Sequence, residues 1–321
     1  METTEKRRDV YAIVTERIIE QLEKGTIPWK QSWTNAGIPQ NLVTGKNYKG
    51  INIILLNSLG YKQNLFLTRK QLEQFGGEVL PNEKPNIVVF WNWNKQEDNS
   101  SSQAIAQEEE LLIEGHKKKK PVLRFYRVFN VSQCVGISND AIPVIKRPND
   151  PIQACEGILE GMRVKPEIVF NEPEAFYDVV EDIINMPEMV RFDNSEFYYD
   201  TLFHEILHWT GHKERLNRPE VTNNTKYGSI EYSLEELTAQ IGASFLCSMT
   251  GIAEKVEEDS TAYIKSWLEK LKNNRKFILI ASSYAQKGVE FILNAKQDRE
   301  VDDSEQWLKE NASNIKKNTK A

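Results

Sequence analysis

The stretch Phe203-His204-Glu205-Ile206-Leu207-His208-Trp209-Thr210-Gly211-His212 contains three of the four histidines in the chain. Its apolar positions predict a helix, on which His204 and His208 lie four residues apart on one face. Two imidazoles at that spacing can bind one metal ion at about 2.0–2.1 Å, and Glu205 beside them can accept a proton from an attacking water. This H-E-x-x-H pattern predicts one Zn²⁺ per chain, or another divalent metal in its place. In the alternative interpretation, the two histidines share a helix face by chance.

A zinc site of this kind takes a third protein ligand and leaves a fourth position for water. Glu235 and Glu236 lie near the start of the next predicted helix, 233–249, and we favour Glu236 as the ligand. In the alternative, Glu236 only completes a capping box with the serine that begins this helix. His212 is the rival ligand, although Gly211 is expected to end the helix before it.

The neighbouring residues favour close packing around this site. Small residues at Ala239, Gly242 and Ala243 predict that the second helix lies tightly against the histidine-bearing helix, which we expect over 195–213. Arg215 and Arg218 could contact an anionic substrate, but the default expectation is that they pair with acidic neighbours.

Composition limits the class of protein. The 321 residues are 40% hydrophobic, which is enough to fill a core, and they include no apolar run long enough for a membrane span. Three widely separated cysteines indicate reduced thiols, and we expect a cytoplasmic protein without a disulfide framework. Residues 1–150 hold 21 Lys and Arg against 17 Asp and Glu, whereas 151–321 hold 20 against 30. This asymmetry predicts two domains with different partners.

Hydrophobic periodicity predicts an α+β protein with an N-terminal domain at 1–145 and a metal-binding domain at 146–321. The proline-rich segment 141–150 is the predicted linker. We expect 97–120, which ends in four lysines, to be a mobile insertion between two paired strands. The predicted helices are 10–24, 68–75, 152–162, 195–213, 233–249, 261–272 and 274–295, and the strands include 87–91, 121–131 and 168–170.

Aromatic and basic residues alternate in the first half of the chain. Single-stranded nucleic acid binds to proteins through base stacking on aromatic faces and through cations along its backbone. Tryptophans more often fill cores, so the composition alone leaves both interpretations open. The predicted nucleic-acid-binding residues are Trp29, Trp33, Asn41, Lys46, Tyr48, Lys49 and Asn52.

Two groups of residues extend this interpretation, because they resemble the ArdC-type antirestriction proteins and the N-terminal part of some plasmid primases. The resemblance covers nearly the whole chain. In the first half it rests on 25–29, Trp33, 39–41, 44–45, Tyr48, 50–52 and 128–134. In the second half it rests on 204–212, 215–216, 235–237, 263–264 and 267–268, which resemble a zincin-like metallopeptidase domain.

The resemblance implies a domain that binds single-stranded DNA, followed by a metallopeptidase-like domain, in a protein that protects mobile DNA from restriction. It implies that His204, His208 and Glu236 bind the metal, that Glu205 is the catalytic base, and that a protein could be the substrate. Relatives tend to carry an acidic residue where this chain has Gln240, and a missing carboxylate would weaken support for a ligand histidine. The alternatives are a non-catalytic DNA-binding protein with a structural or vestigial metal, and a peptidase whose first domain recognises protein.

Overall fold

The computed structural model describes residues 9–29, 37–92, 122–143, 151–223, 228–252 and 260–295. It confirms an α+β protein. The insertion 97–120, Trp33 and most of the proposed linker lie outside these residues. The helices are α1 (Val10–Glu23), α2 (Ile51–Asn57), α3 (Arg69–Gln74), α4 (Pro151–Gly161), α5 (Ser195–Thr210), α6 (Pro219–Thr222), α7 (Ile230–Thr250), α8 (Ser260–Asn273) and α9 (Phe277–Ile292). The strands are β1 (Gln40–Asn41), β2 (Leu65–Leu67), β3 (Glu78–Val79), β4 (Asn86–Asn92), β5 (Val122–Asn130), β6 (Cys134–Val135), β7 (Glu167–Val169), β8 (Phe176–Asp178) and β9 (Ile183–Asn185).

The first half of the chain is built on a four-stranded sheet with the order β1-β2-β5-β4. Strands β4 and β5 form the predicted pair, which is antiparallel, with Val88 opposite Tyr126 and Phe90 opposite Arg124. Thr68, where the predicted helix 68–75 begins, is the N-cap of α3: its hydroxyl accepts the Gln71 amide while the Gln71 side chain accepts the Thr68 amide. A short pair, β3 with β6, lies beyond the main sheet.

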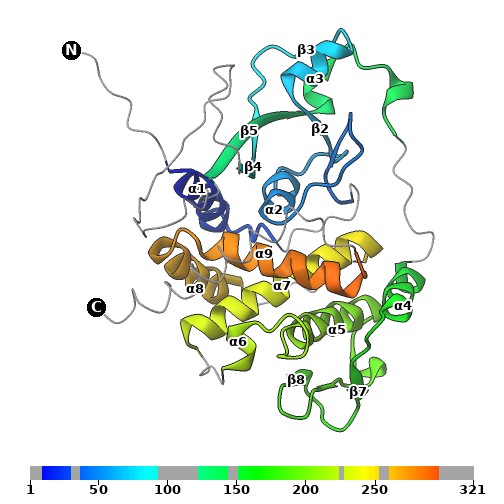
Figure 1. Cartoon of the computed structure of the whole chain (residues 1–321). Helices are drawn as coiled ribbons and strands as arrows, with labels where there is room; N and C mark the ends of the chain where they lie inside the picture. The colour runs from blue at the N-terminus through cyan, green and yellow to red at the C-terminus, as the bar shows by residue number, and fades with distance from the viewer. Residues whose placement is uncertain are drawn as a thin grey trace, which may run out of the picture.

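The second half combines a small sheet with helices. Strands β7, β9 and β8 form a three-stranded sheet in that order, and β8 and β9 both contact α5. Helix α9 contacts α2 on one side and α7 on the other, and it crosses the middle of the molecule in Figure 1. Helix α7 in turn packs against α5, so the histidine-bearing helix lies on the far side of α7 and α9 from the four-stranded sheet.

Glycines allow the close approach of these helices. A Cβ at Gly242 on α7 would lie 2.5 Å from Leu207 of α5, and a Cβ at Gly288 on α9 would also lie 2.5 Å from that side chain. Leu207 is fully buried between them. The predicted tight packing against α5 is therefore confirmed at Gly242, and α9 contributes a second close contact that the pattern did not indicate.

Helix α7 begins earlier than predicted, and this changes the environment of its glutamates. Ser229 is the N-cap and accepts the Tyr232 amide at 3.1 Å, so the predicted capping box at Ser233 and Glu236 is wrong. Ser233 lies inside the helix, where its hydroxyl donates to the Ser229 carbonyl at 2.8 Å. Since an earlier serine caps the helix, the side chain of Glu236 is available for another role.

The largest hydrophobic cluster contains residues from both halves of the chain. Helix α1 packs against α8, and the Trp29 ring meets the edge of Trp267 with 6.1 Å between centroids. Helix α1 and Trp29 are therefore joined to helices α8 and α9 by a common core. Across the described ranges, no helix is both long and apolar enough to span a lipid bilayer.

Candidate metal centre

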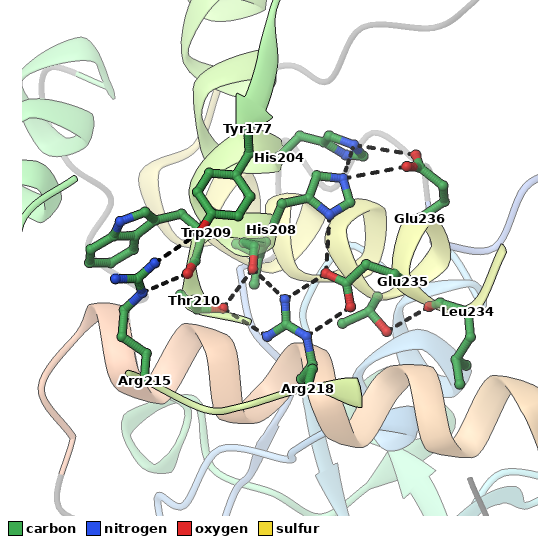
Figure 2. A network of polar contacts seen from close by, with 12 residues as sticks. Tyr177, His204, His208, Trp209, Thr210, Arg215, Arg218, Leu234, Glu235 and Glu236 are labelled. Atoms are coloured by element: carbon green, nitrogen blue, oxygen red, sulfur yellow. Dashed lines mark hydrogen bonds and ion pairs between the residues drawn. The ribbon is translucent and has the colours of Figure 1, made fainter. Parts of the chain in front are cut away.

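Three predicted ligand residues converge between α5 and α7. The Nε2 atoms of His204 and His208 are 3.0 Å apart, and each lies 3.6 Å from an oxygen of Glu236. Figure 2 shows the carboxylate of Glu236 directed at both rings from the facing helix. One donor atom from each residue lies within 4.8 Å of the others, a separation that allows one ion to contact all three.

The chemistry of this donor set fits a divalent transition metal. Two imidazole nitrogens and one carboxylate oxygen match a catalytic zinc site, in which a fourth position is open. The side chains of His204, His208 and Glu236 are 22%, 13% and 26% exposed, so the cluster is enclosed without being sealed from solvent. These three residues would hold the ion, and the 16-residue helix α5 positions two of them at i and i+4.

A second glutamate supports the cluster from behind. The Glu235 Oε1 lies 3.1 Å from the Nδ1 of His208, the ring nitrogen that faces away from Glu236. A hydrogen bond from Nδ1–H to this carboxylate selects the tautomer whose Nε2 can bind a metal. Glu235 therefore orients His208, while its neighbour Glu236 faces the metal position.

A buried arginine holds Glu235 in turn. Arg218 donates to the two Glu235 oxygens from Nε at 2.8 Å and from Nη2 at 2.6 Å, a bidentate pair in which both residues are almost fully buried. The same guanidinium donates to the Thr210 hydroxyl at 2.8 Å and to the Leu207 carbonyl at 2.5 Å. As Figure 2 shows, Arg218 connects the end of α5 with α7 beneath the cluster.

The turn after α5 lets Arg218 reach this position. A Cβ at Gly211 would lie 2.8 Å from Nη2 of Arg218 and 2.5 Å from Val221, so only glycine leaves room for the guanidinium. The Arg218 amide donates to the Gly211 carbonyl at 2.9 Å, which closes the chain back onto the helix end. Gly211 was predicted only to end the helix, and its role in admitting Arg218 became visible in the structure.

The charges around His208 favour its protonated form in the absence of a cation. Burial lowers the pKa of His208, but the carboxylates of Glu235, Glu236 and Glu205 outweigh burial and raise it to about 9. Burial raises the pKa of Glu236, but the hydrogen bond to His204 and the charge of His208 outweigh burial and lower this pKa to about 2. A divalent cation would replace the proton that these carboxylates otherwise hold on the imidazole.

Glu205 follows the first ligand on α5 and is 7% exposed. His212, the rival ligand, lies elsewhere: its Nδ1 accepts the Glu214 amide at 3.3 Å and is 4.0 Å from Asp182. The metal-binding group found among the described residues does not include His212. Because Gln240 stands where relatives tend to carry an acidic residue, a ligand histidine was expected to lack a supporting carboxylate. Glu235 supplies such a carboxylate to His208.

The default expectation for the two arginines is confirmed, because each pairs with an acidic residue. Arg215 stacks on the Trp209 ring at 3.9 Å and donates to Asp182 through both terminal nitrogens. Tyr177 on β8 joins this cluster by donating to Asp182 at 2.8 Å. Arg218, in contrast, was missed as part of the metal centre, since no spacing rule relates it to Glu235.

Three predicted nucleic-acid-binding residues are buried. Trp29 is 0% exposed, Tyr48 6% and Asn52 4%. The Asn52 amide exchanges two hydrogen bonds of 2.7 Å with the Val89 backbone and so covers the free edge of β4. These side chains offer no free face to a base in this structure, so direct contact of Trp29, Tyr48 and Asn52 with DNA stays a prediction that their burial does not favour.

The remaining predicted contacts differ in their surroundings. Asn41 accepts the amides of Val43 and Thr44 at 3.1 and 3.0 Å, and thereby stabilises the turn that carries the exposed Lys46. Lys49 is paired with Glu290 of α9 at 2.9 Å. Of the seven predicted residues, Lys46 is the side chain in the described structure that matches a surface phosphate contact best.

Comparisons with known proteins agree with both halves of this structure. Residues 8–129 match the model of the N-terminal domain of anti-restriction factor ArdC, and residues 154–284 match a zincin-like metallopeptidase model. Two Escherichia coli proteins described as DNA primase TraC are 31% and 30% identical over 92% and 91% of this chain. The aligned region spans only 20% and 28% of their lengths. The uncharacterized protein y4eC of Sinorhizobium fredii is 28% identical, with 92% of this chain and 95% of that protein covered.

Two solved structures match over almost their full length. Both are of the antirestriction ArdC protein from plasmid R388, one metal-free and one Mn(II)-bound. The metal-free structure is 32% identical with a TM-score of 0.67, and it covers 89% of this chain and 97% of that one. The Mn(II)-bound structure is 31% identical with a TM-score of 0.68, covering 91% and 100%. This chain therefore belongs to the ArdC-type antirestriction family and carries a zincin-like domain.

Proposed function

We propose that this protein is an antirestriction factor that combines single-stranded DNA binding with a zinc-dependent, peptidase-like site. The observation that carries the proposal is the convergence of the His204, His208 and Glu236 donor atoms within 4.8 Å of one another. The Mn(II) in the solved ArdC structure supports a divalent ion in this family, and the His–His–Glu donor set favours Zn²⁺. We further propose a division near residue 145, between the two matched regions.

The residues around the cluster define the chemistry proposed. A divalent cation held there would supply Lewis acidity toward water and toward a substrate carbonyl. Glu205 would accept the proton of the attacking water and deliver it to the leaving amine. Glu235 keeps the His208 ring turned so that its Nε2 faces the cation position.

Replacement of Glu205 by Gln tests this assignment. The change keeps the side-chain volume but removes the base, so hydrolysis of labelled casein should fall by roughly 10²–10⁴-fold. Metal content, measured by elemental analysis, should match the wild type because Glu205 is not among the donors. A matched change at Glu214, which lies on the turn after α5, should leave both quantities unaltered. Full hydrolysis by the Glu205→Gln variant would reject the proposed base.

A second candidate is a DNA-binding protein whose metal is structural. It is favoured by the position of the cluster between α5 and α7, where a bound ion would join the two helices that the Arg218–Glu235 pair also links. Transfer of unmodified plasmid into a restricting host would separate the two candidates. Loss of protection with Glu205→Gln supports the catalytic proposal, whereas full protection supports the structural alternative.

A further inference from the structure

A continuous row of aromatic rings crosses one side of the four-stranded sheet. Tyr61 meets Phe66 with 6.0 Å between ring centroids, and Phe66 meets Tyr48 at 6.3 Å. Tyr48 lies 6.4 Å from Phe90, which in turn meets Tyr126 at 5.7 Å. Most of these contacts are edge-to-face, so each ring fixes the orientation of the next. Tyr48 and Phe66 in the middle of the row are buried in a second hydrophobic cluster, and Tyr61 and Tyr126 are partly buried against it.

The strand register shows why this side is available. Phe90 is paired with Arg124 and Val88 with Tyr126, so these four side chains project from the same face. Phe90 is 43% exposed, although its contact partner Tyr48 is only 6% exposed. Val88 on this face is buried in the second hydrophobic cluster, and Val89 and Leu123 on the opposite face are buried in the main one. Both faces of the sheet are therefore mostly covered, and Phe90 on the outer strand β4 is the ring of this row that is exposed to solvent, beside the partly buried Tyr126.

The charge of this surface favours an anionic partner. Strands β4 and β5 contain no aspartate or glutamate, and of their two arginines Arg124 projects from this face, whereas Arg127 is paired with Ile87 and projects from the other. Arg124 lies directly across from Phe90, and the exposed Lys46 and Lys62 lie close in sequence to Tyr48 and Tyr61. The exposed Phe90 and the partly exposed Tyr126 lie beside Arg124, on strands without carboxylates, and aromatic rings next to cations can bind unpaired bases and their phosphates. A duplex is a poorer fit, because its bases are already stacked on one another.

We propose that single-stranded DNA binds on this face, with bases stacked on Phe90 and Tyr126 and phosphates near Arg124 and Lys46. The inference rests on the DNA binding proposed above and gives it a location. It also assigns Tyr48 a role compatible with its burial. Tyr48 is a positioning residue that holds the Phe90 ring from behind, rather than a stacking platform.

The test is a fluorescence anisotropy titration of the full chain with a labelled 20-nucleotide oligo(dT). Phe90→Ala should weaken binding by about 5- to 150-fold, the range measured for the loss of one base stack. Phe90→Trp should retain affinity, because it keeps a stacking face. For Lys46→Gln, the slope of log affinity against log salt concentration should become shallower by about 0.7, the value for one phosphate contact on a single strand. The matched control is Phe75→Ala, which removes a 37% exposed phenylalanine in the same half of the chain.

The outcomes distinguish this surface from the broader proposal. If the wild type binds no oligo(dT), single-stranded DNA binding itself is refuted, and this surface is refuted with it. If the wild type binds and Phe90→Ala binds equally well, DNA binding stands and this face is wrong. Equal losses in Phe90→Ala and Phe75→Ala would also overturn the assignment, since they would indicate a general defect. Circular dichroism melts of each variant establish whether the fold is retained.

Discussion

Replacing Glu235 with Gln should lower both the folding stability of the metal-free protein and the affinity for metal, through two different contacts of this carboxylate. The substitution is nearly isosteric, but it removes the charge that neutralises Arg218, whose side chain is 2% exposed. Breaking a buried ion pair from one side costs about 3–5 kcal/mol, because the other charge remains buried without compensation. The change also weakens the contact at 3.1 Å that orients His208, and losing such a contact lowers metal affinity by about 10–100-fold.

Two measurements follow these effects separately. Urea unfolding of the chelator-treated protein reports the stability cost without any contribution from metal. Calorimetric titration with Zn²⁺ and with Mn²⁺ then reports affinity. The matched control is Glu236→Gln, whose side chain is 26% exposed and faces the donors rather than Arg218. It should reduce metal affinity at least as strongly, while the unfolding free energy of the metal-free protein should fall by less than in Glu235→Gln, because no buried arginine loses its counter-charge.

The reasoning fails if Glu235→Gln leaves the unfolding midpoint of the metal-free protein unchanged. That result would mean that Arg218 finds another counter-charge or water, and that its bidentate contact contributes little. Unchanged affinity for both metals would refute the role of Glu235 in orienting His208. A loss of affinity without a loss of stability would retain the orienting role and reject the estimated cost of the buried pair.

Three further predictions concern packing and the metal. Gly242→Ala should destabilise the protein by about 1–3 kcal/mol in urea unfolding, because the new Cβ would lie 2.5 Å from Leu207. The control is Gly157→Ala on α4, where a Cβ meets nothing within 4 Å, and this change should be neutral or stabilising. Asn52→Ala should cost about 1–3 kcal/mol by leaving the Val89 edge groups unpaired, and hydrogen exchange of β4 amides should accelerate. Adding Zn²⁺ at 100 times its Kd should raise the unfolding free energy by about 2.7 kcal/mol, and a chelator should reverse this gain. A melting temperature that changes neither with added Zn²⁺ nor with the chelator would argue against the metal centre.

Local patterns predicted much of this structure because they depend on neighbouring residues. The helix carrying His204 and His208, the cap at Thr68 and the β4–β5 pair all follow from spacing within a short window. The predicted start of α7 was wrong because Ser229 and Ser233 are both suitable N-cap residues, and the local sequence does not favour one over the other. Trp29 was assigned to a DNA surface because its neighbours are polar, yet its ring contacts Trp267 from the other half of the chain.

The sequence by itself determined the chemistry available at the centre: two imidazoles at helical spacing and a pair of adjacent glutamates. Only the tertiary structure decided which of the two glutamates faces the metal position and which contacts Arg218. Successive residues on a helix point about 100° apart, so the packing of α7 against α5 turns Glu236 toward the ring nitrogens and Glu235 toward Arg218. The same holds for the aromatic residues, since strand register and the shared core determine that Trp29 is enclosed and that Phe90 meets solvent.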